Sequence, residues 1–232
     1  MQPKIIAFAG PIASGKDTIQ NALIKHLKIS SPITLSFGHA LKQEVELLIS
    51  YTLKFYDKLD CNFYCFMQEN FQTDIASIKE AVRLICIIHD NYNAKMLSTK
   101  YKTKEMRQLL QFWGTDVRRK VDEDYWVDII KRQINYAIQN RYTIFITDCR
   151  FSNEMNLIKN SGGVLIHITA PIDTRLKRIY QRDGFIPTVK ELKHQSEIYF
   201  DNYSKYDLTI NNTDDTLDQQ INKITEFLQQ KY

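Results

Sequence analysis

The segment 10–18 carries the pattern with the clearest chemical use. It reads G-P-I-A-S-G-K-D-T and stands between an apolar run, 4–9, and an amphipathic stretch, 17–27. Small residues let consecutive backbone N–H groups curl around a phosphate, and the start of a helix adds the positive end of its dipole. In this context the spacing Gly-x4-Gly-Lys predicts a phosphate-binding loop rather than a glycine turn with a surface lysine. The residues expected to hold the phosphates of ATP are Gly10, Ala13, Ser14, Gly15, Lys16, Asp17 and Thr18.

Two side chains of this loop have predicted roles of their own. Lys16 is expected to bridge the β- and γ-phosphates and to follow the charge as it moves during transfer. Asp17 stands where such loops usually carry Ser or Thr. Thr18 is therefore the predicted hydroxyl for the phosphate or for Mg²⁺.

A carboxylate and a guanidinium follow a later apolar run. The run 142–147 has the pattern of a buried strand, and Asp148 and Arg150 come directly after it. Open α/β sheets bind their ligands at the carboxyl ends of strands, where a carboxylate can hold Mg²⁺ through water. Asp148 is thus predicted to hold the metal and Arg150 to point into the same crevice. The alternative is a structural Asp–Arg pair.

Three arginines recur on one face of the predicted helix 172–182. Arg175, Arg178 and Arg182 are spaced by three and four residues. Together with residues 183–204 they have the layout of a lid, in which arginines close over a transferring phosphate and exclude water. Arg175 is expected to contact ATP and Arg178 to act in the transfer. The alternative is a solvated basic face.

Four further segments follow in a fixed order. They are R-Q-L-L-Q-F-W-G-T-D-V-R-R at 107–119, V-D-E-D-Y-W-V at 121–127, T-D-C-R-F-S-N-E at 147–154, and H-Q-S-E at 194–197. Together with G-K-D-T they resemble the deoxynucleoside monophosphate kinase family of bacteriophages and some bacteria. The resemblance covers residues 4–211, interrupted by 51–102.

The resemblance implies that ATP, with Mg²⁺, phosphorylates a deoxynucleoside monophosphate and leaves ADP and a diphosphate. It implies that Arg107 and Arg119 clamp the acceptor phosphate, and the family spacing favours Arg119 over Arg118. The other residues that it assigns to the acceptor are Lys42, Gln111, Trp113, Thr115, Asp116, Arg150 and Glu154. Two of these carry open alternatives, because Trp113 either stacks on the base or packs in the core, and Glu154 either touches the acceptor or caps the following helix.

The elements that must position these groups alternate along the chain. Apolar runs at 4–9, 33–37, 142–147, 164–168 and 207–210 predict strands, and amphipathic stretches at 17–27, 39–50, 103–113, 125–140, 152–160, 172–182 and 216–230 predict helices. This order predicts an α/β fold, a P-loop kinase with a doubly wound parallel sheet flanked by helices. Residues 1–232 are expected to form one domain. Residues 51–102, with one predicted helix near 75–89, are interpreted as a helical insertion.

Composition narrows the classes of partner. The chain has 232 residues and a net charge of +4, which suits anionic small molecules but is too weak to argue for nucleic acid. It has no apolar run long enough for a membrane span. The four cysteines are interpreted as free thiols of a cytoplasmic protein, because no pair at ligand spacing completes a metal site with Cys61 and Cys65. The resemblance suggests a homodimer.

Two other functions compete with this interpretation. Phosphomevalonate kinases of the animal type and dephospho-coenzyme A kinases share parts of the pattern and phosphorylate other small molecules, but the G-T-D-x-x-R and R-F-x-N-E segments favour a nucleotide. A nucleotide-dependent switch is the second alternative. A GTPase of that kind should carry an N-K-x-D guanine motif, which the sequence lacks.

Overall fold

The computed structural model describes residues 4–92, 97–101, 103–213 and 215–231. The chain divides into two compact units, Met1–Phe37 with Val127–Tyr232, and Gly38–Trp126. We call the first the sheet unit and the second the helical unit. In the described ranges no helix combines the length and the apolar character that crossing a membrane requires.

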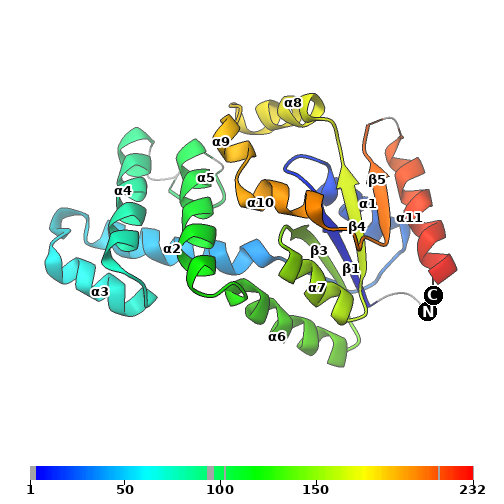
Figure 1. Ribbon diagram of the computed structural model, residues 1–232, viewed down its shortest axis with the longest axis horizontal. Helices are drawn as coiled ribbons and strands as arrows, with labels where there is room; N and C mark the ends of the chain where they lie inside the picture. The colour runs from blue at the N-terminus through cyan, green and yellow to red at the C-terminus, as the bar shows by residue number, and fades with distance from the viewer. Residues whose placement is uncertain (1–3, 93–96, 102, 214, 232) are drawn as a thin grey trace. The chain divides into compact units, whose positions relative to one another are not determined.

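The sheet unit contains five parallel strands. They are β1 (Ile5–Ala9), β2 (Pro32–Leu35), β3 (Thr143–Cys149), β4 (Val164–Thr169) and β5 (Leu208–Asn211). Their order is β2-β3-β1-β4-β5, so β1 lies between β3 and β4, as Figure 1 shows. The carboxyl end of β1 is therefore the centre of the edge where such sheets bind ligands.

Helices cover both faces of this sheet because β1 is apolar on both sides. Ile5, Ala7 and Ala9 belong to the core shared with two helices on one face, whereas Ile6 and Phe8 belong to the core shared with two helices on the other (Figure 1). The pairs are α6 (Tyr125–Gln139) with α7 (Ser152–Asn160), and α1 (Lys16–His26) with α11 (Leu217–Lys231). A strand buried on both faces has this continuous apolar pattern. The predicted doubly wound sheet is confirmed.

The segment after β4 forms the predicted arginine helix and a set of short helices. Helix α8 (Ile172–Asp183) ends at Gly184, whose φ of 77° is the left-handed conformation that suits glycine at a helix end. The sequence predicts one short helix near Val189. The structure has α9 (Val189–Leu192), α10 (Gln195–Ile198) and a 3₁₀ turn, Tyr199–Asn202.

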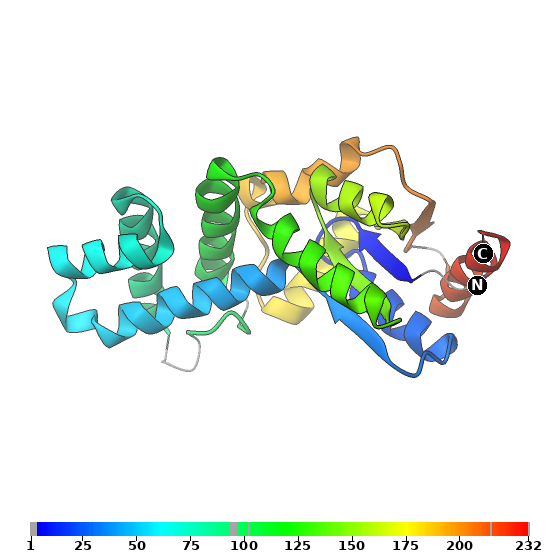
Figure 2. The same ribbon diagram turned by 90° about the horizontal axis from the view of Figure 1, so that it is seen from below.

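The helical unit contains more regular structure than the sequence predicts. Its elements are α2 (Phe37–Lys54), a 3₁₀ turn (Tyr56–Lys58), α3 (Cys61–Phe71), α4 (Ile75–Asn91), α5 (Lys104–Gln111) and a π-helix (Phe112–Arg119). The path from α2 through α3 to α4 can be followed in Figure 2. Residue Phe37 starts α2 and does not belong to strand β2, contrary to the predicted strand 33–37.

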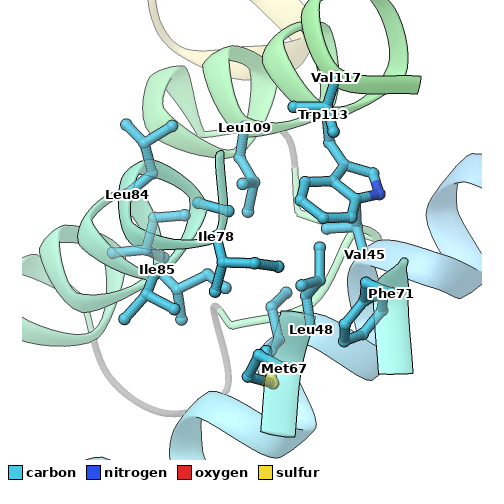
Figure 3. Close-up of a cluster of buried hydrophobic side chains, with 14 of the residues drawn as sticks. Val45, Leu48, Met67, Phe71, Ile78, Leu84, Ile85, Leu109, Trp113 and Val117 are labelled. Atoms are coloured by element: carbon cyan, nitrogen blue, oxygen red, sulfur yellow. The ribbon is translucent and has the colours of Figure 1, made fainter. Parts of the chain in front are cut away.

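A separate hydrophobic core holds the helical unit together. Figure 3 shows Trp113 and Leu109 facing side chains from α2, α3 and α4, among them Val45, Met67 and Ile78. All five side chains are fully buried. The helical unit thus has a hydrophobic core of its own.

Candidate active site

The phosphate loop has the backbone that its glycines predict. Gly10 and Gly15 have φ values of 139° and 104°, and a Cβ atom on either would lie about 2 Å from its neighbours, 2.1 Å from the Ile168 carbonyl oxygen and 2.0 Å from Asn212 Nδ2. Both positions therefore require glycine. Ala13 also lies in the left-handed region, at a φ of 59°. Non-glycine residues adopt this conformation at sites whose geometry the surroundings enforce.

The Lys16 ammonium folds back onto its own loop. Its Nζ atom donates to the carbonyl oxygens of Gly10 at 2.9 Å and Pro11 at 2.8 Å, and to Ser14 Oγ at 3.4 Å. Burial, followed by the positive charge of Arg150, lowers the pKa of Lys16 to about 8. The charged ammonium is thus held in a place where it lacks full solvation, and phosphate oxygens would improve its surroundings.

This lowered pKa predicts how ATP affinity depends on pH. Below about pH 8 Lys16 carries its charge in the free protein, and above it the charge is lost. Bound phosphates favour the ammonium, so ATP affinity should fall by up to about tenfold per pH unit above pH 8. Titration calorimetry between about pH 6.5 and 9.5 measures this. A Lys16→Met variant should bind weakly without this slope, and a constant affinity of the natural protein across the range contradicts the prediction.

Asp148 joins the end of β3 to the start of α2. Ser36 Oγ donates to Asp148 Oδ2 at 2.6 Å, and the Phe37 N–H donates to Oδ1 at 3.0 Å. The carboxylate therefore caps the N-terminus of α2, and it also lies close enough to Lys16 to raise the lysine pKa. Among the described residues, no three His, Cys, Asp or Glu side chains gather as a metal site.

Arg150 pairs with Glu197, a residue for which the sequence predicts no role of its own. Its Nη1 atom makes an ion pair with Glu197 Oε1 and donates to the Ser196 carbonyl oxygen at 3.1 Å. The other carboxylate oxygen of Glu197 accepts from the Ile12 N–H of the phosphate loop at 3.0 Å. The H-Q-S-E segment at 194–197 was the only sequence signal for this contact.

The lid arginines differ in what they contact. Arg178 Nη1 donates to the Ala13 carbonyl oxygen at 3.2 Å, and Arg178 Nη2 to the Asn212 carbonyl oxygen at 3.4 Å. Asn212, which sequence reasoning missed, follows β5 and donates from Nδ2 to the Ser14 carbonyl oxygen at 2.7 Å. Arg182 instead pairs with Asp183. Arg178 is thus held at the phosphate loop by hydrogen bonds, whereas Arg182 forms an ion pair with Asp183 of its own helix.

A cavity of about 220 Å³ opens beside the first residues of the loop. Arg175, Glu197 and Pro11 contribute to its wall, together with apolar side chains of α8, α9 and α10. Arg175 Nε donates to the Ala170 carbonyl oxygen at 3.1 Å, which fixes the guanidinium at the end of β4. The segment 183–204 therefore lines this cavity.

In the helical unit the adjacent arginines 118 and 119 are both buried, at 9% and 8% exposure, but their hydrogen-bond partners differ. Arg118 makes an ion pair with Glu44, donates to the Phe71 carbonyl oxygen at 2.6 Å, and lies over the Trp113 ring at 5.1 Å. Arg119 Nη1 donates to the Glu123 carbonyl oxygen at 2.9 Å. Arg118 is thus part of the core of this unit.

The remaining predicted acceptor residues of the helical unit lie on α2, α5 and the π-helix. Lys42 and Asp116 are exposed, and Arg107, Gln111 and Thr115 are half-buried. π-Helices are rare and frequently occur at functional sites, so this one is an independent sign of function that the sequence pattern did not show.

Two of the predicted acceptor residues, Trp113 and Glu154, have the surroundings of the alternative role given for them. Trp113 has no exposed surface, donates from Nε1 to Glu44 Oε1 at 3.0 Å, and meets the Phe71 ring edge-on. No face of the indole is available to a base. Glu154 is also buried, and its Oε2 atom accepts from the N–H groups of Arg150 at 2.7 Å and Phe151 at 3.2 Å. Glu154 therefore caps α7, which was the stated alternative.

The two units divide the predicted site residues between them. The sheet unit brings together the phosphate loop, Asp148, Arg150, Arg175 and Arg178. The helical unit carries Lys42, Arg107, Gln111, Thr115, Asp116 and Arg119.

Comparison with known proteins gives a family match and several solved structures with low similarity. The model of the family described as deoxynucleotide monophosphate kinase matches residues 37–224. No curated protein matches the sequence. Among solved structures, shikimate kinase from Acinetobacter baumannii in complex with shikimate has 11% identity and a TM-score of 0.46, over 100% of this chain and 95% of that one. Dephospho-CoA kinase from Campylobacter jejuni has 16% identity and a TM-score of 0.46, over 97% of each chain.

The family match spans most of the chain. It begins after the phosphate loop, so the loop geometry is independent of it. The chain belongs to the deoxynucleotide monophosphate kinase family.

Proposed function

We propose that the phosphate loop binds ATP with Mg²⁺, and that Lys16, Arg150 and Arg178 stabilise the terminal phosphate as it moves to the phosphate of a deoxynucleoside monophosphate. The observation that carries this proposal is the pair of cations at the loop. Lys16 lies inside the loop, and Arg150 is close enough to lower its pKa. Two neighbouring cations that are only partly exposed to solvent suit an anionic ligand.

Phosphate transfer to this acceptor requires few other groups from the protein. The acceptor phosphate is already ionised near neutral pH, so no strong general base is needed. The obstacles are the approach of two anions and the charge that spreads over the transferring group in a loose transition state. Fixed cations and exact alignment of donor and acceptor address both obstacles.

The residues at the loop fit Mg²⁺. This ion keeps several waters and takes one or two protein oxygens besides the phosphates. Thr18 offers an exposed hydroxyl at the start of α1, and Asp148 offers a half-buried carboxylate near Lys16. Both Asp148 oxygens already accept a hydrogen bond, which suits contact through water better than direct coordination. Bound there, the ion would neutralise charge on the phosphates.

We assign the acceptor to the helical unit through Lys42, Arg107, Gln111, Thr115, Asp116 and Arg119. Arginine forks match phosphate oxygens in pairs, which is why Arg107 and Arg119 are given its phosphate. We place the protein in the cytoplasm, because its cysteines are free thiols and two of them, Cys61 and Cys65, are exposed. We also propose a homodimer.

A coupled ADP-release assay tests the proposed function. ATP with Mg²⁺ is offered together with dTMP, dGMP, dCMP or dAMP, and the ribonucleotides, phosphomevalonate and dephospho-coenzyme A are matched alternatives. We expect acceptor-dependent turnover on at least one deoxynucleotide and its loss when EDTA removes Mg²⁺. Turnover on a non-nucleotide acceptor alone would overturn the substrate. ATP loss that ignores every acceptor would point to a nucleotide-dependent switch.

A further inference from the structure

One buried carboxylate ties together three segments of the sheet unit. Glu197 lies on α10, and its side chain is 7% exposed. Oε1 pairs with Arg150 after β3, and Oε2 accepts from the Ile12 N–H in the phosphate loop at 3.0 Å. These contacts span 47 and 185 residues of sequence. A buried carboxylate with partners on two other segments restricts where those segments can lie.

We propose that Glu197 is a positioning residue for phosphate transfer: it holds the Arg150 guanidinium against the phosphate loop, ready for the transferring phosphate. This inference rests on the proposed role of Arg150. The residue itself touches no reacting atom in this role and acts through Arg150.

The geometry of Arg150 supports this assignment. Glu197 and the Ser196 carbonyl oxygen both engage Nη1. No other described residue accepts a hydrogen bond from Arg150 Nε or Nη2, and 36% of the side chain is exposed. One edge of the guanidinium is thus fixed by the protein, and the other edge can form a paired contact with phosphate oxygens.

The two positive charges at the loop also favour a carboxylate at position 197. Lys16 and Arg150 repel each other in the absence of ATP, whereas the negative charge of Glu197 raises the pKa of Lys16 and pairs with Arg150. Without this anion, Arg150 would gain by turning away into solvent. Holding the arginine in place beforehand removes the entropy loss of ordering it during the reaction.

Another buried glutamate of the same region serves as the control. Glu191 on α9 accepts from the Thr188 N–H at 2.7 Å and from Thr188 Oγ1 at 2.6 Å, so these contacts cap its own helix. It is as buried as Glu197: the whole residue is 6% exposed for Glu191 and 9% for Glu197. If α9 and α10 need only a buried carboxylate in order to fold, both glutamates should matter equally.

The test compares Glu197→Gln, Glu197→Asp and Glu191→Gln in the full chain. Gln keeps a neutral acceptor for Ile12 but loses the ion pair with Arg150. We expect Glu197→Gln to lower kcat by about 10- to 100-fold, with the KM for ATP within about threefold of the natural value. Glu197→Asp, which keeps the charge, should recover part of the loss. Glu191→Gln should keep kcat within about twofold.

A double-mutant cycle separates positioning from a general structural effect. In the Arg150→Ala background, Glu197→Gln should lower kcat by less than about twofold more, because its partner is already gone. Multiplicative losses, a higher kcat in Glu197→Gln, or an equal loss in Glu191→Gln would overturn the inference. If the thermal transition shows that Glu197→Gln does not fold, Glu197→Asp is measured instead, in the natural protein and in the Arg150→Ala background. The same comparison of kcat losses then applies. Unchanged kcat in Arg150→Ala alone would instead sink the proposed role of Arg150.

Discussion

Replacing Lys16 with alanine should lower kcat for phosphate transfer by on the order of 10³-fold, the loss typical of removing one fixed donor to developing charge. The ammonium lies among the Gly10 and Pro11 carbonyl oxygens, at the loop that the phosphates of ATP should fill. Lys16 is the only lysine in the segment 10–18. Coupled turnover under saturating ATP and acceptor measures the loss.

The fold should survive this substitution. Burial lowers the Lys16 pKa, which means that the folded protein holds the ammonium less favourably than water does. Removing the charge therefore relieves an unfavourable interaction as well as losing hydrogen bonds, and the thermal transition should move by only a few degrees. Lys25→Ala on the same helix is the matched control, because Lys25 is exposed in the last turn of α1. Turnover of Lys16→Ala within about tenfold of that of the natural protein would contradict the assigned role of the phosphate loop in the transfer.

The sheet could be predicted because its signals are local. A strand buried on both faces is a continuous apolar run, and the glycines of the phosphate loop stand at a fixed spacing after it. Helix α3 was missed because Phe63, Met67 and Phe71, its buried residues, lie among Cys, Tyr and Asn that hide the helical period. The π-helix was missed because its extra residue per turn leaves no mark in the composition.

The contacts of Glu197 could not be predicted from local sequence patterns. Its partners Arg150 and Ile12 are remote in the sequence, and only the folded sheet brings α10 to the loop. Trp113 shows the converse problem. Its place in a family segment allowed contact with a base or packing in the core, and the segment supplies part of the core of the helical unit. A motif can thus mark a position that supports a site without touching the ligand.

The adjacent arginines 118 and 119 allow this distinction to be measured. Arg119→Ala should raise the KM for the acceptor or lower kcat, by about 100-fold in kcat/KM, because one fork to the acceptor phosphate is lost. The Kd for ATP should stay within about twofold, since the phosphate loop is unchanged. Arg119→Lys keeps the charge without the fork and should recover only part of the activity. Initial rates with varied acceptor, and calorimetry with ATP alone, measure these effects.

Arg118→Ala should behave in the opposite way. It leaves the Glu44 carboxylate, whose side chain is 14% exposed, without its ion pair, and it removes the cation from the faces of Trp113 and Tyr125. Removing one partner of a buried ion pair destabilises a protein by about 3 kcal/mol. This variant should therefore lower the thermal transition of the helical unit and change the affinity for the acceptor little. If instead Arg119→Ala lost ATP binding, Arg119 would not be the acceptor clamp. If Arg118→Ala lost acceptor affinity with an unchanged thermal transition, the clamp would belong to Arg118. The neighbouring pair therefore decides, within one motif, which arginine binds the acceptor and which supports the fold.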